Sequence, residues 1–196
     1  VALIGLILLN EDLFIGMLIF IGIAVLLTFF SFMGMKKTTY LKLFDLPSGG
    51  NHITRSIIFK DDKLYVSTGS SCNVCVEDDN RRAAIWVANP DGSDFKSFAQ
   101  GLRNSVFMTL HPTTKEIWAT DMGRDLLGDD IPKEDVNIIH EGNHYGWPYC
   151  YENKVIDQGM NPNNSKFDCE KSTSPHLSFQ AHSAPLGLAF FMNFQV

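Results

Sequence analysis

Residues 55–69 read RSIIFKDDKLYVSTG, and residues 106–123 return to the same pattern as VFMTLHPTTKEIWATDMG. Each copy holds two short runs rich in β-branched and aromatic residues on either side of a polar turn, which predicts a β-hairpin. Leu64 in the first copy corresponds to Ile117 in the second, an offset of 53 residues. A period of roughly 40 to 50 residues with about four strands per repeat is typical of the blades of a β-propeller.

The sequence around the two copies is also rich in short strand-like runs. Turn signals such as Asn89-Pro90-Asp91-Gly92 separate these runs, and no long stretch at the helical period follows residue 36. We therefore expect an all-β domain over residues 38–196. Its predicted strands include Ser56–Phe59, Lys63–Ser67, Ala84–Ala88, Glu116–Thr120 and Val136–Ile139.

The pattern also predicts how much of a propeller the chain contains. Pro185–Phe191 reads as the opening of a third copy, after an insertion over Arg124–Ala184. At about 50 residues per blade this predicts about three blades, whereas closed propellers have four to eight. An open array would expose strand edges and apolar faces between blades. Because the chain begins at Val1 rather than Met and stops just after the third copy opens, we expect it to be a piece of a longer protein.

A long apolar segment precedes the β-rich part. Leu13–Met35 holds 23 residues without a charge, which is long enough to cross the ~30 Å hydrocarbon core of a bilayer as a helix. A cleaved signal peptide and a buried helix are the alternatives, but the segment is long and ends without a small-residue cleavage site. We therefore predict transmembrane sequence within residues 1–37, with Val1–Leu9 as a candidate for the end of an earlier span.

The charge of the remaining chain excludes one class of partner. Residues 36–196 carry all 16 basic residues and 20 of the 22 acidic ones, a net charge of about −4. Binding to nucleic acid needs clustered Lys and Arg, and the basic clusters here are only the pairs Lys36-Lys37 and Arg81-Arg82. A nucleic-acid partner is therefore not expected.

Four cysteines occur as two pairs. Cys72 and Cys75 form a Cys-x-x-Cys motif, and 18 residues separate Cys150 from Cys169. A zinc site is the alternative, but the second pair is too widely spaced to favour one. Disulfides Cys72–Cys75 and Cys150–Cys169 fit an oxidising compartment, and the larger loop would contribute about 3 kcal/mol. This outweighs Lys36-Lys37, which by the positive-inside rule would place the domain in the cytoplasm.

Several motifs in one order carry a resemblance to a known family. They are Gly49-Gly50-Asn51-His52, Gly101-Leu102-Arg103-Asn104, Asp121-Met122-Gly123-Arg124-Asp125, Gly128-Asp129-Asp130-Ile131-Pro132 and Tyr145-Gly146-Trp147-Pro148-Tyr149-Cys150. From about Asp45 to Phe190 the chain resembles the sorbosone-dehydrogenase-like branch of the soluble quinoprotein sugar dehydrogenases. The resemblance implies a six-bladed β-propeller that uses pyrroloquinoline quinone (PQQ).

The resemblance assigns roles to three residues. His52 matches the base that removes the substrate hydroxyl proton while hydride passes to the quinone, and the ordinary histidine pKa near 6.5 suits that task. Arg103 and Asn104 match a pair that contacts the quinone oxygens, where a guanidinium stabilises developing negative charge. The chain departs from the family at Phe107, where a glycine is common. It departs again at Ser70, where glucose-oxidising members often carry the acid that orients the catalytic histidine.

The resemblance also implies Ca²⁺ in the acidic loop Met122–Asn137. The predicted ligands are the backbone carbonyls of Gly123 and Arg124 and the carboxylate of Glu134. Ca²⁺ takes several oxygen ligands, including backbone carbonyls, so the loop has suitable chemistry. It lacks the regular Asp spacing of an EF-hand, and the prediction therefore depends on the resemblance.

The sequence thus predicts a membrane-anchored, extracytoplasmic PQQ-dependent dehydrogenase that oxidises a hydroxyl or hemiacetal of an aldose- or sorbosone-type sugar. Its electron acceptor is not identified by the sequence. The alternatives are a non-catalytic, membrane-anchored propeller that serves as a binding module, and a Ca²⁺-dependent lactone hydrolase, for which no supporting residue set is present. We expect this chain alone to be inactive, because the resemblance places the basic residues that hold the quinone carboxylates in later blades.

Overall fold

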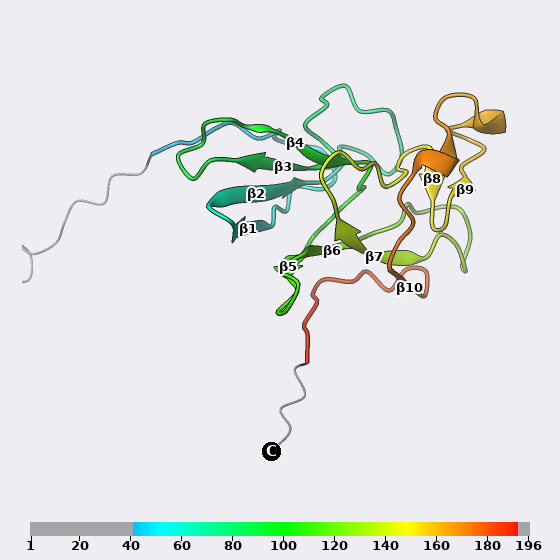
Figure 1. Ribbon diagram of the computed structural model, residues 1–196. Helices are drawn as coiled ribbons and strands as arrows, with labels where there is room; N and C mark the ends of the chain where they lie inside the picture. Colours follow the sequence, from blue (N-terminus) through cyan, green and yellow to red (C-terminus); the bar gives the residue numbers. More distant parts are fainter. Residues whose placement is uncertain (1–40, 192–196) are drawn as a thin grey trace, which may run out of the picture. The chain divides into compact units, whose positions relative to one another are not determined.

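The computed structural model describes residues 41–191, which form β-strands joined by long loops (Figure 1). The first sheet, called blade one here, has four antiparallel strands in the order β1-β2-β3-β4. Each strand pairs with the one before it in the chain, which is the arrangement of a propeller blade. The strands are β1 (Ile57–Lys60), β2 (Lys63–Thr68), β3 (Ala84–Ala88) and β4 (Lys96–Gln100).

The second sheet, called blade two, has the order β10-β7-β6-β5 and is also antiparallel. Its outermost strand, β10, comes more than thirty residues after its partner β7, because a small subdomain is inserted between them. The strands of blade two are β5 (Met108–Leu110), β6 (Ile117–Asp121), β7 (Glu134–Ile139) and β10 (Leu177–Phe179).

The inserted subdomain contains a hairpin of β8 (Cys150–Tyr151) and β9 (Val155–Ile156), followed by two 3-10 turns, η2 (Pro162–Asn164) and η3 (Cys169–Lys171). The disulfide Cys150–Cys169 joins the start of β8 to η3. Buried Asn161 adds polar bonds in the same place, since its side chain accepts from the Lys166 N–H and donates to the Phe167 carbonyl. The subdomain is thus held by one covalent link and a buried amide.

Strand pairing confirms the internal repeat. Ile58 pairs with Tyr65 in blade one, and Thr109 pairs with Trp118 in blade two. The first strands of the two copies are therefore offset by 51 residues and the second strands by 53, and the longer turn of the second copy takes up the difference. The expectation of an all-β fold holds for the described residues, which contain strands and two 3-10 turns but no α-helix.

The main hydrophobic core lies between the two blades. Successive residues of a strand face opposite sides of the sheet, and in β3 Ile85 and Val87 face this core. Ile85 is completely buried, and burying a side chain of this size contributes about 1.5–3 kcal/mol. The other buried members of the cluster are Tyr65, Ala99, Leu102, Met108, Ile117, Ala119 and Ile139.

The opposite face of blade one has a smaller core. Trp86, which lies between the two core residues of β3, stacks on Phe95 at a ring distance of 4.8 Å, and Phe95 stacks on Phe44 at 4.4 Å. The segment that precedes blade one therefore covers this face. Both faces of β3 are buried, which explains why its sequence, AIWVA, shows no polar alternation.

The number of blades differs from the sequence-based expectation. The described residues form two four-stranded sheets rather than about three, because the segment Arg124–Ala184 is not only an insertion but supplies β7 and β10 of blade two. Pro185–Phe191 forms no strand. Instead Phe190 packs edge-on against Trp118 of β6, with ring centroids 5.1 Å apart.

The outer strands leave apolar side chains exposed, as expected for an open array. Ile57 and Phe59 on β1 are 58% and 62% exposed, and Leu177 and Phe179 on β10 are 50% and 44% exposed. Strand edges of this kind are normally paired or covered. The closed six-bladed ring that the resemblance implies stays a prediction.

The membrane prediction concerns residues that the structure does not describe. The predicted span Leu13–Met35, within the segment 1–37, lies outside residues 41–191. Inside that range no helix is long and apolar enough to cross a bilayer.

Candidate functional site

His52 lies in an extended loop before β1, packed against the loop that follows β2. Its backbone N–H donates to the Ser70 carbonyl at 3.3 Å, and the neighbouring Asn51 N–H donates to the Ser71 carbonyl at 2.9 Å. The Arg55 guanidinium donates to the His52 carbonyl at 3.0 Å and to the Pro47 carbonyl at 2.8 Å. The loop has no regular secondary structure, so these bonds fix the position of His52.

The hydrogen bonds of Ser70 determine the tautomer of His52. The Nδ1 atom of His52 lies 2.8 Å from Ser70 Oγ and 3.1 Å from the Ser70 carbonyl oxygen. The Ser70 hydroxyl donates its only proton to the Cys72 carbonyl at 2.7 Å, so Oγ acts as an acceptor toward the ring. The carbonyl oxygen can only accept. Nδ1 therefore carries the ring proton of neutral His52, and the lone pair is left on Nε2.

The surroundings also keep His52 uncharged. Partial burial lowers its pKa below 6.5, and the positive charge of Arg103 lowers it further. Ser70 is fully buried and has no charge, so it stabilises the imidazolium less than a carboxylate would. The departure from the family pattern at Ser70 thus keeps the orienting contact but removes its negative charge.

Gly69 allows His52 to approach the next site residue. A Cβ atom at Gly69 would lie 2.5 Å from the Cβ of His52 and 2.8 Å from Oδ1 of Asn104. Both distances are below any normal contact, so a side chain at this position would push the two residues apart. His52 and Asn104 are therefore close neighbours in space although 52 positions separate them in the sequence.

Arg103 is buried, with only 5% of its surface exposed, and its guanidinium is surrounded by protein acceptors. Nε and one terminal nitrogen donate to the backbone carbonyl and the side-chain oxygen of Asn73, at 2.8 and 2.9 Å. The other terminal nitrogen donates to the Gly123 carbonyl at 2.7 Å and, more weakly, to that of Met122 at 3.3 Å. A fifth contact reaches Asp125 at 3.4 Å. All five N–H groups have partners, so Arg103 offers a fixed positive charge rather than a free donor.

The side chain of Asp121, the last residue of β6, holds the backbone of Arg103 and Asn104. The Asp121 carboxylate accepts from the N–H groups of Arg103 at 3.0 Å and Asn104 at 2.7 Å. Burial raises the Asp121 pKa to about 7, although these N–H bonds oppose the shift. Among the described residues, the Asn104 amide makes only a weak contact, from Nδ2 to the Met122 sulfur at 3.5 Å. The Asn104 amide therefore has fewer protein partners than Arg103.

Two of the three predicted calcium ligands already have other partners. The Gly123 carbonyl accepts from the Arg103 guanidinium at 2.7 Å, so a cation on this oxygen would lie beside another positive charge. The buried Glu134 carboxylate accepts from the Gly123 N–H at 2.8 Å. The third predicted ligand is the backbone carbonyl of Arg124, whose side chain pairs with buried Asp157 at 2.6 Å. The calcium assignment stays a prediction.

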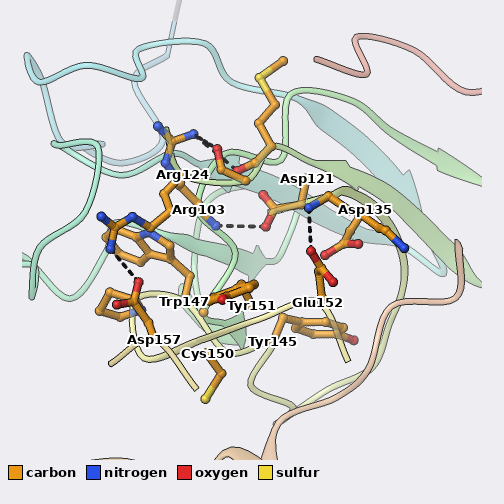
Figure 2. A pocket seen from close by; sticks show the side chains of 15 residues that line it. Arg103, Asp121, Arg124, Asp135, Tyr145, Trp147, Cys150, Tyr151, Glu152 and Asp157 are labelled. Atoms are coloured by element: carbon orange, nitrogen blue, oxygen red, sulfur yellow. Dashed lines mark hydrogen bonds and ion pairs between the residues drawn. The ribbon is translucent and has the colours of Figure 1, made fainter. Parts of the chain in front are cut away.

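Figure 2 shows a pocket lined by the turn at Gly123 and Arg124, the end of β6, the start of β7 and the β8–β9 hairpin. Arg124 points across it toward Asp157, and Asp121 lies beside the Arg103 backbone. His52 does not line the pocket. Its ionisable lining residues are Arg103, Asp121, Arg124, Lys133, Asp135, Glu152 and Asp157.

Asp135 in this pocket gives a testable pH dependence of stability. Burial raises its pKa from 3.8 to about 7, and the negative charge of Glu152 adds to the shift. The folded state therefore binds this proton more tightly than the unfolded state. The resulting stabilisation is fully present below about pH 4 and is lost as the pH rises to about 7. One pKa unit corresponds to about 1.4 kcal/mol, so about 4 kcal/mol is an upper limit.

We expect Asp135→Asn to remove this pH dependence. In denaturant unfolding of the protein expressed from its complete gene, the variant should gain stability relative to wild type as the pH rises from about 4.5 to 7.5. Partial burial lowers the pKa of His144 to about 4, which contributes an opposite slope at the acid end, so the informative quantity is the difference between the two proteins. The exposed neighbour Asp130→Asn is the control. A constant difference between wild type and Asp135→Asn across this range would contradict the prediction.

The cysteine predictions are confirmed. Cys72 is bonded to Cys75 and Cys150 to Cys169, and no free cysteine remains, so the zinc alternative is wrong for these four residues. The first disulfide closes the loop that contacts both Ser70 and Arg103. The second lies in the inserted subdomain.

His144, which directly precedes the motif Tyr145–Cys150, has a structural role. Its ring packs on Phe167 at 4.4 Å, and Nδ1 accepts the Gly146 N–H at 3.1 Å. The following Tyr145 donates its hydroxyl proton to the Ile138 carbonyl at 2.7 Å, which ties the motif to β7. The aromatic motif therefore packs blade two against the inserted subdomain.

Sequence reasoning did not assign roles to two residues of the site, Asn73 and Asp121. Asp121 stands in a quoted motif, directly before the Gly123 turn, but its role as backbone acceptor for Arg103 and Asn104 depends on a contact between loops. Asn73 lies inside the Cys-x-x-Cys motif, whose cysteines alone indicate a function from the sequence. The sequence feature that points to Asn73 is its place as a polar residue within a short disulfide loop.

Comparisons with known proteins place these features in context. The sequence profile of the family described as Glucose / Sorbosone dehydrogenase matches residues 36–196. An uncharacterized protein of Borreliella burgdorferi is 36% identical over 136 residues, which cover 67% of this chain and 34% of that protein. A protein of Hypocrea jecorina described as a pyrroloquinoline quinone-dependent sugar dehydrogenase is 26% identical over 193 residues, which cover 73% of this chain and 44% of that protein.

Among solved structures, the calcium structure of a Trichoderma reesei protein of Carbohydrate-Active Enzymes Family AA12 superimposes with a TM-score of 0.58. The identity is 24%, and the match covers 71% of this chain and 46% of that structure, so it supports the shared fold. The chain spans between a third and a half of the length of these relatives. Because the family profile covers more than half of the sequence, the chain belongs to the glucose/sorbosone dehydrogenase family.

Proposed function

We propose that this chain carries the base and part of the charge environment of a PQQ-dependent sugar dehydrogenase. The observation that carries the proposal is the state of His52, whose Nδ1 proton is held by Ser70 while Nε2 has no partner among the described residues. A neutral imidazole with a free Nε2 is the form that acts as a general base. The Hypocrea jecorina relative, by its description, supports PQQ as the cofactor and a sugar as the substrate.

In the proposed reaction His52 Nε2 accepts the proton of a sugar hydroxyl or hemiacetal. Loss of this proton drives the adjacent C–H hydrogen to leave as hydride, so the sugar loses two electrons and becomes a carbonyl compound. The lowered pKa keeps His52 unprotonated at neutral pH, before the substrate proton arrives. Ser70 keeps Nδ1 protonated throughout, so the ring needs no tautomer change when Nε2 takes the proton.

Arg103 and Asn104 act on the charge that develops. With all five N–H groups occupied, Arg103 stabilises negative charge on a neighbouring acceptor through its field, which is strong because the side chain is buried. Asn104 is the residue that can donate a hydrogen bond to a bound group, since in residues 41–191 the Met122 sulfur is the one partner of its amide. The uncharged base His52, the Asn104 amide and the buried Arg103 cation together suit the oxidation of an alcohol. The base takes the hydroxyl proton, and the amide and the cation stabilise the electron acceptor as it gains negative charge.

A bound PQQ would supply the two-electron acceptor for the substrate hydride. His52, Asn104 and the Arg103 charge are the groups of this chain that would face it. No step is assigned to Ca²⁺, because Gly123 and Glu134 already bond to other groups. A membrane-anchored domain outside the cytoplasm remains part of the proposal, and the two disulfides support an oxidising compartment.

The test is dye reduction by the protein expressed from its complete gene. A panel of aldoses is supplied to apoprotein with PQQ, with Ca²⁺, with both and with neither. We expect sugar-dependent dye reduction only where PQQ is present. A folded apoprotein that shows no PQQ-dependent activity on any sugar would contradict the proposal and favour the membrane-tethered binding module instead.

A further inference from the structure

We propose that the disulfide-closed loop Cys72–Cys75 is the positioning element of the site, with Asn73 as the residue that fixes Arg103. The inference rests on the proposed function, because it concerns the same two groups, His52 and Arg103. The loop belongs to blade one, whereas the Gly123 turn that it meets belongs to blade two. Its role is therefore to set the two halves of the site relative to each other.

Asn73 contacts Arg103 twice. Its backbone carbonyl accepts from Nε at 2.8 Å, and its side-chain oxygen accepts from a terminal nitrogen at 2.9 Å. These two bonds run along one edge of the planar guanidinium, while the Gly123 carbonyl takes the other terminal nitrogen at 2.7 Å. Because acceptors bind the planar guanidinium on two sides, they fix its orientation. Asn73 thus determines where the buried charge of Arg103 lies.

Asn73 also joins the loop to blade two. Its side-chain oxygen accepts the Asp125 N–H at 2.8 Å, and its side-chain nitrogen donates to the Asp125 carbonyl at 3.1 Å. The amide therefore pairs with the backbone of Asp125 in both directions, as a strand would. One side chain holds the Gly123 turn and the guanidinium in a single network.

The neighbouring residue of the loop acts on His52. The Cys72 carbonyl accepts the Ser70 hydroxyl proton at 2.7 Å, and this bond makes Ser70 Oγ the acceptor for His52 Nδ1. The Ser70 carbonyl, 3.1 Å from Nδ1, can only accept and holds the same proton. The Cys72 carbonyl therefore adds to this preference, because it keeps the Ser70 hydroxyl from competing as a donor to Nδ1.

The disulfide fixes both contacts together. Cys72 and Cys75 close a loop of two intervening residues, so the Cys72 carbonyl and Asn73 cannot turn independently. Glu77 holds the preceding residue, since its carboxylate accepts from the N–H and the hydroxyl of Ser71, each at 2.7 Å. Ser71 in turn accepts the Asn51 N–H at 2.9 Å. The loop is thus anchored on the side of His52 as well as on the side of Arg103.

The first experiment compares three variants of the protein expressed from its complete gene. Asn73→Ala removes the side-chain bonds to Arg103 and Asp125. Asn73→Asp keeps the acceptor oxygen that serves both and loses the amide donor to the Asp125 carbonyl. Asn80→Ala is the matched control, because Asn80 is an exposed asparagine of the same inter-strand loop. We expect Asn73→Ala to lower kcat at least about tenfold, the scale of one charge-assisted hydrogen bond, with KM for the sugar nearly unchanged. Asn73→Asp should recover most of the loss, and Asn80→Ala should behave like wild type.

The second measurement does not depend on activity. Exchange of the Arg103 guanidinium N–H protons with water is followed by nitrogen-15 NMR, with Arg103→Lys used to identify the signal. We expect exchange at least about tenfold faster in Asn73→Ala than in wild type, because one of the bonds that protects these protons is lost. Unchanged exchange, or an Asn73→Asp variant as impaired as Asn73→Ala, would overturn the proposal.

A paired substitution tests the disulfide itself. Cys72→Ser with Cys75→Ser should raise the Arg103 exchange rate in the same way as Asn73→Ala. Cys150→Ser with Cys169→Ser should lower the melting temperature without changing this exchange rate, because the second disulfide lies in the inserted subdomain. Equal effects of the two pairs on the exchange rate would show that loss of a disulfide acts only through general stability, which would refute a positioning role. If wild type shows no PQQ-dependent turnover, the proposed function fails while the exchange rates still decide the positioning role.

Discussion

His52→Gln is expected to lower the turnover of sugar at least about 100-fold in the protein expressed from its complete gene, with PQQ binding nearly unchanged. A positioned general base contributes about 100- to 10,000-fold to a proton transfer, and glutamine cannot accept the proton. Glutamine can still place an amide near Ser70, so the loop around residue 52 should keep its shape. The measurement is steady-state dye reduction at saturating sugar, together with a titration of PQQ.

His140→Gln is the matched control for this variant. His140 is exposed, and no hydrogen bond of its side chain occurs among the described residues, so its replacement should leave turnover unchanged. Turnover of His52→Gln within about threefold of wild type would remove His52 as the base. The same assay gives a pH profile. Activity of the wild type should fall as the pH drops through the His52 pKa, which lies below 6.5.

Arg103→Ala is expected to unfold the site as well as to slow the reaction. The substitution leaves partly buried acceptors on both sides without a donor, namely Asn73 and the carbonyls of the Gly123 turn. Leaving such acceptors unsatisfied costs about 1–3 kcal/mol. The free energy of unfolding from denaturant titration should fall by about this amount. PQQ binding and turnover should weaken together, because the charge acts on the bound cofactor and on the developing negative charge.

Arg103→Lys separates the charge of this residue from its shape. Lysine keeps the positive charge but cannot reach Asn73 and Gly123 at the same time with a planar fork. We expect it to restore part of the lost turnover and little of the lost stability. The pH profile gives an independent check, since Arg103 lowers the His52 pKa and Arg103→Ala should therefore move the acid limb to higher pH. An acid limb that stays in place would show that the two groups are not coupled.

The sequence predicted the strands with the clearest composition and missed those without it. Residues 84–88 read AIWVA and were recognised, whereas β4, with the sequence KSFAQ, has too few apolar residues to mark it as a strand. β10 has three residues, and each of its side chains is exposed. Its pairing with β7 brings together residues 41 to 45 positions apart, and no local pattern reveals such a pairing. The sequence therefore predicts an insertion over Arg124–Ala184 and about three blades.

The sequence motifs select His52, Arg103 and Asn104 as candidate site residues, and the missing acid draws attention to Ser70. The structure places His52 beside Ser70 and close to Asn104, while the chemical roles of these residues stay predictions. Asn73 was not identified, because its importance comes from backbone and side-chain contacts to two loops that lie 30 and 52 residues further along the chain. Nor does the sequence show that Arg103 is fully bonded. That property depends on the carbonyl directions of the Gly123 turn, which follow from the folded backbone.

Gly69, which lies between His52 and Asn104, limits which substitutions this site can accept. Gly69 takes no part in chemistry, yet a single methyl group there would overlap both neighbours. The spacing between the His52 imidazole and the Asn104 amide therefore depends on the absence of a Cβ atom at residue 69, and no substitution at this position can preserve it. Variation that keeps this spacing has to come from other positions, because any side chain at residue 69 would push His52 and Asn104 apart.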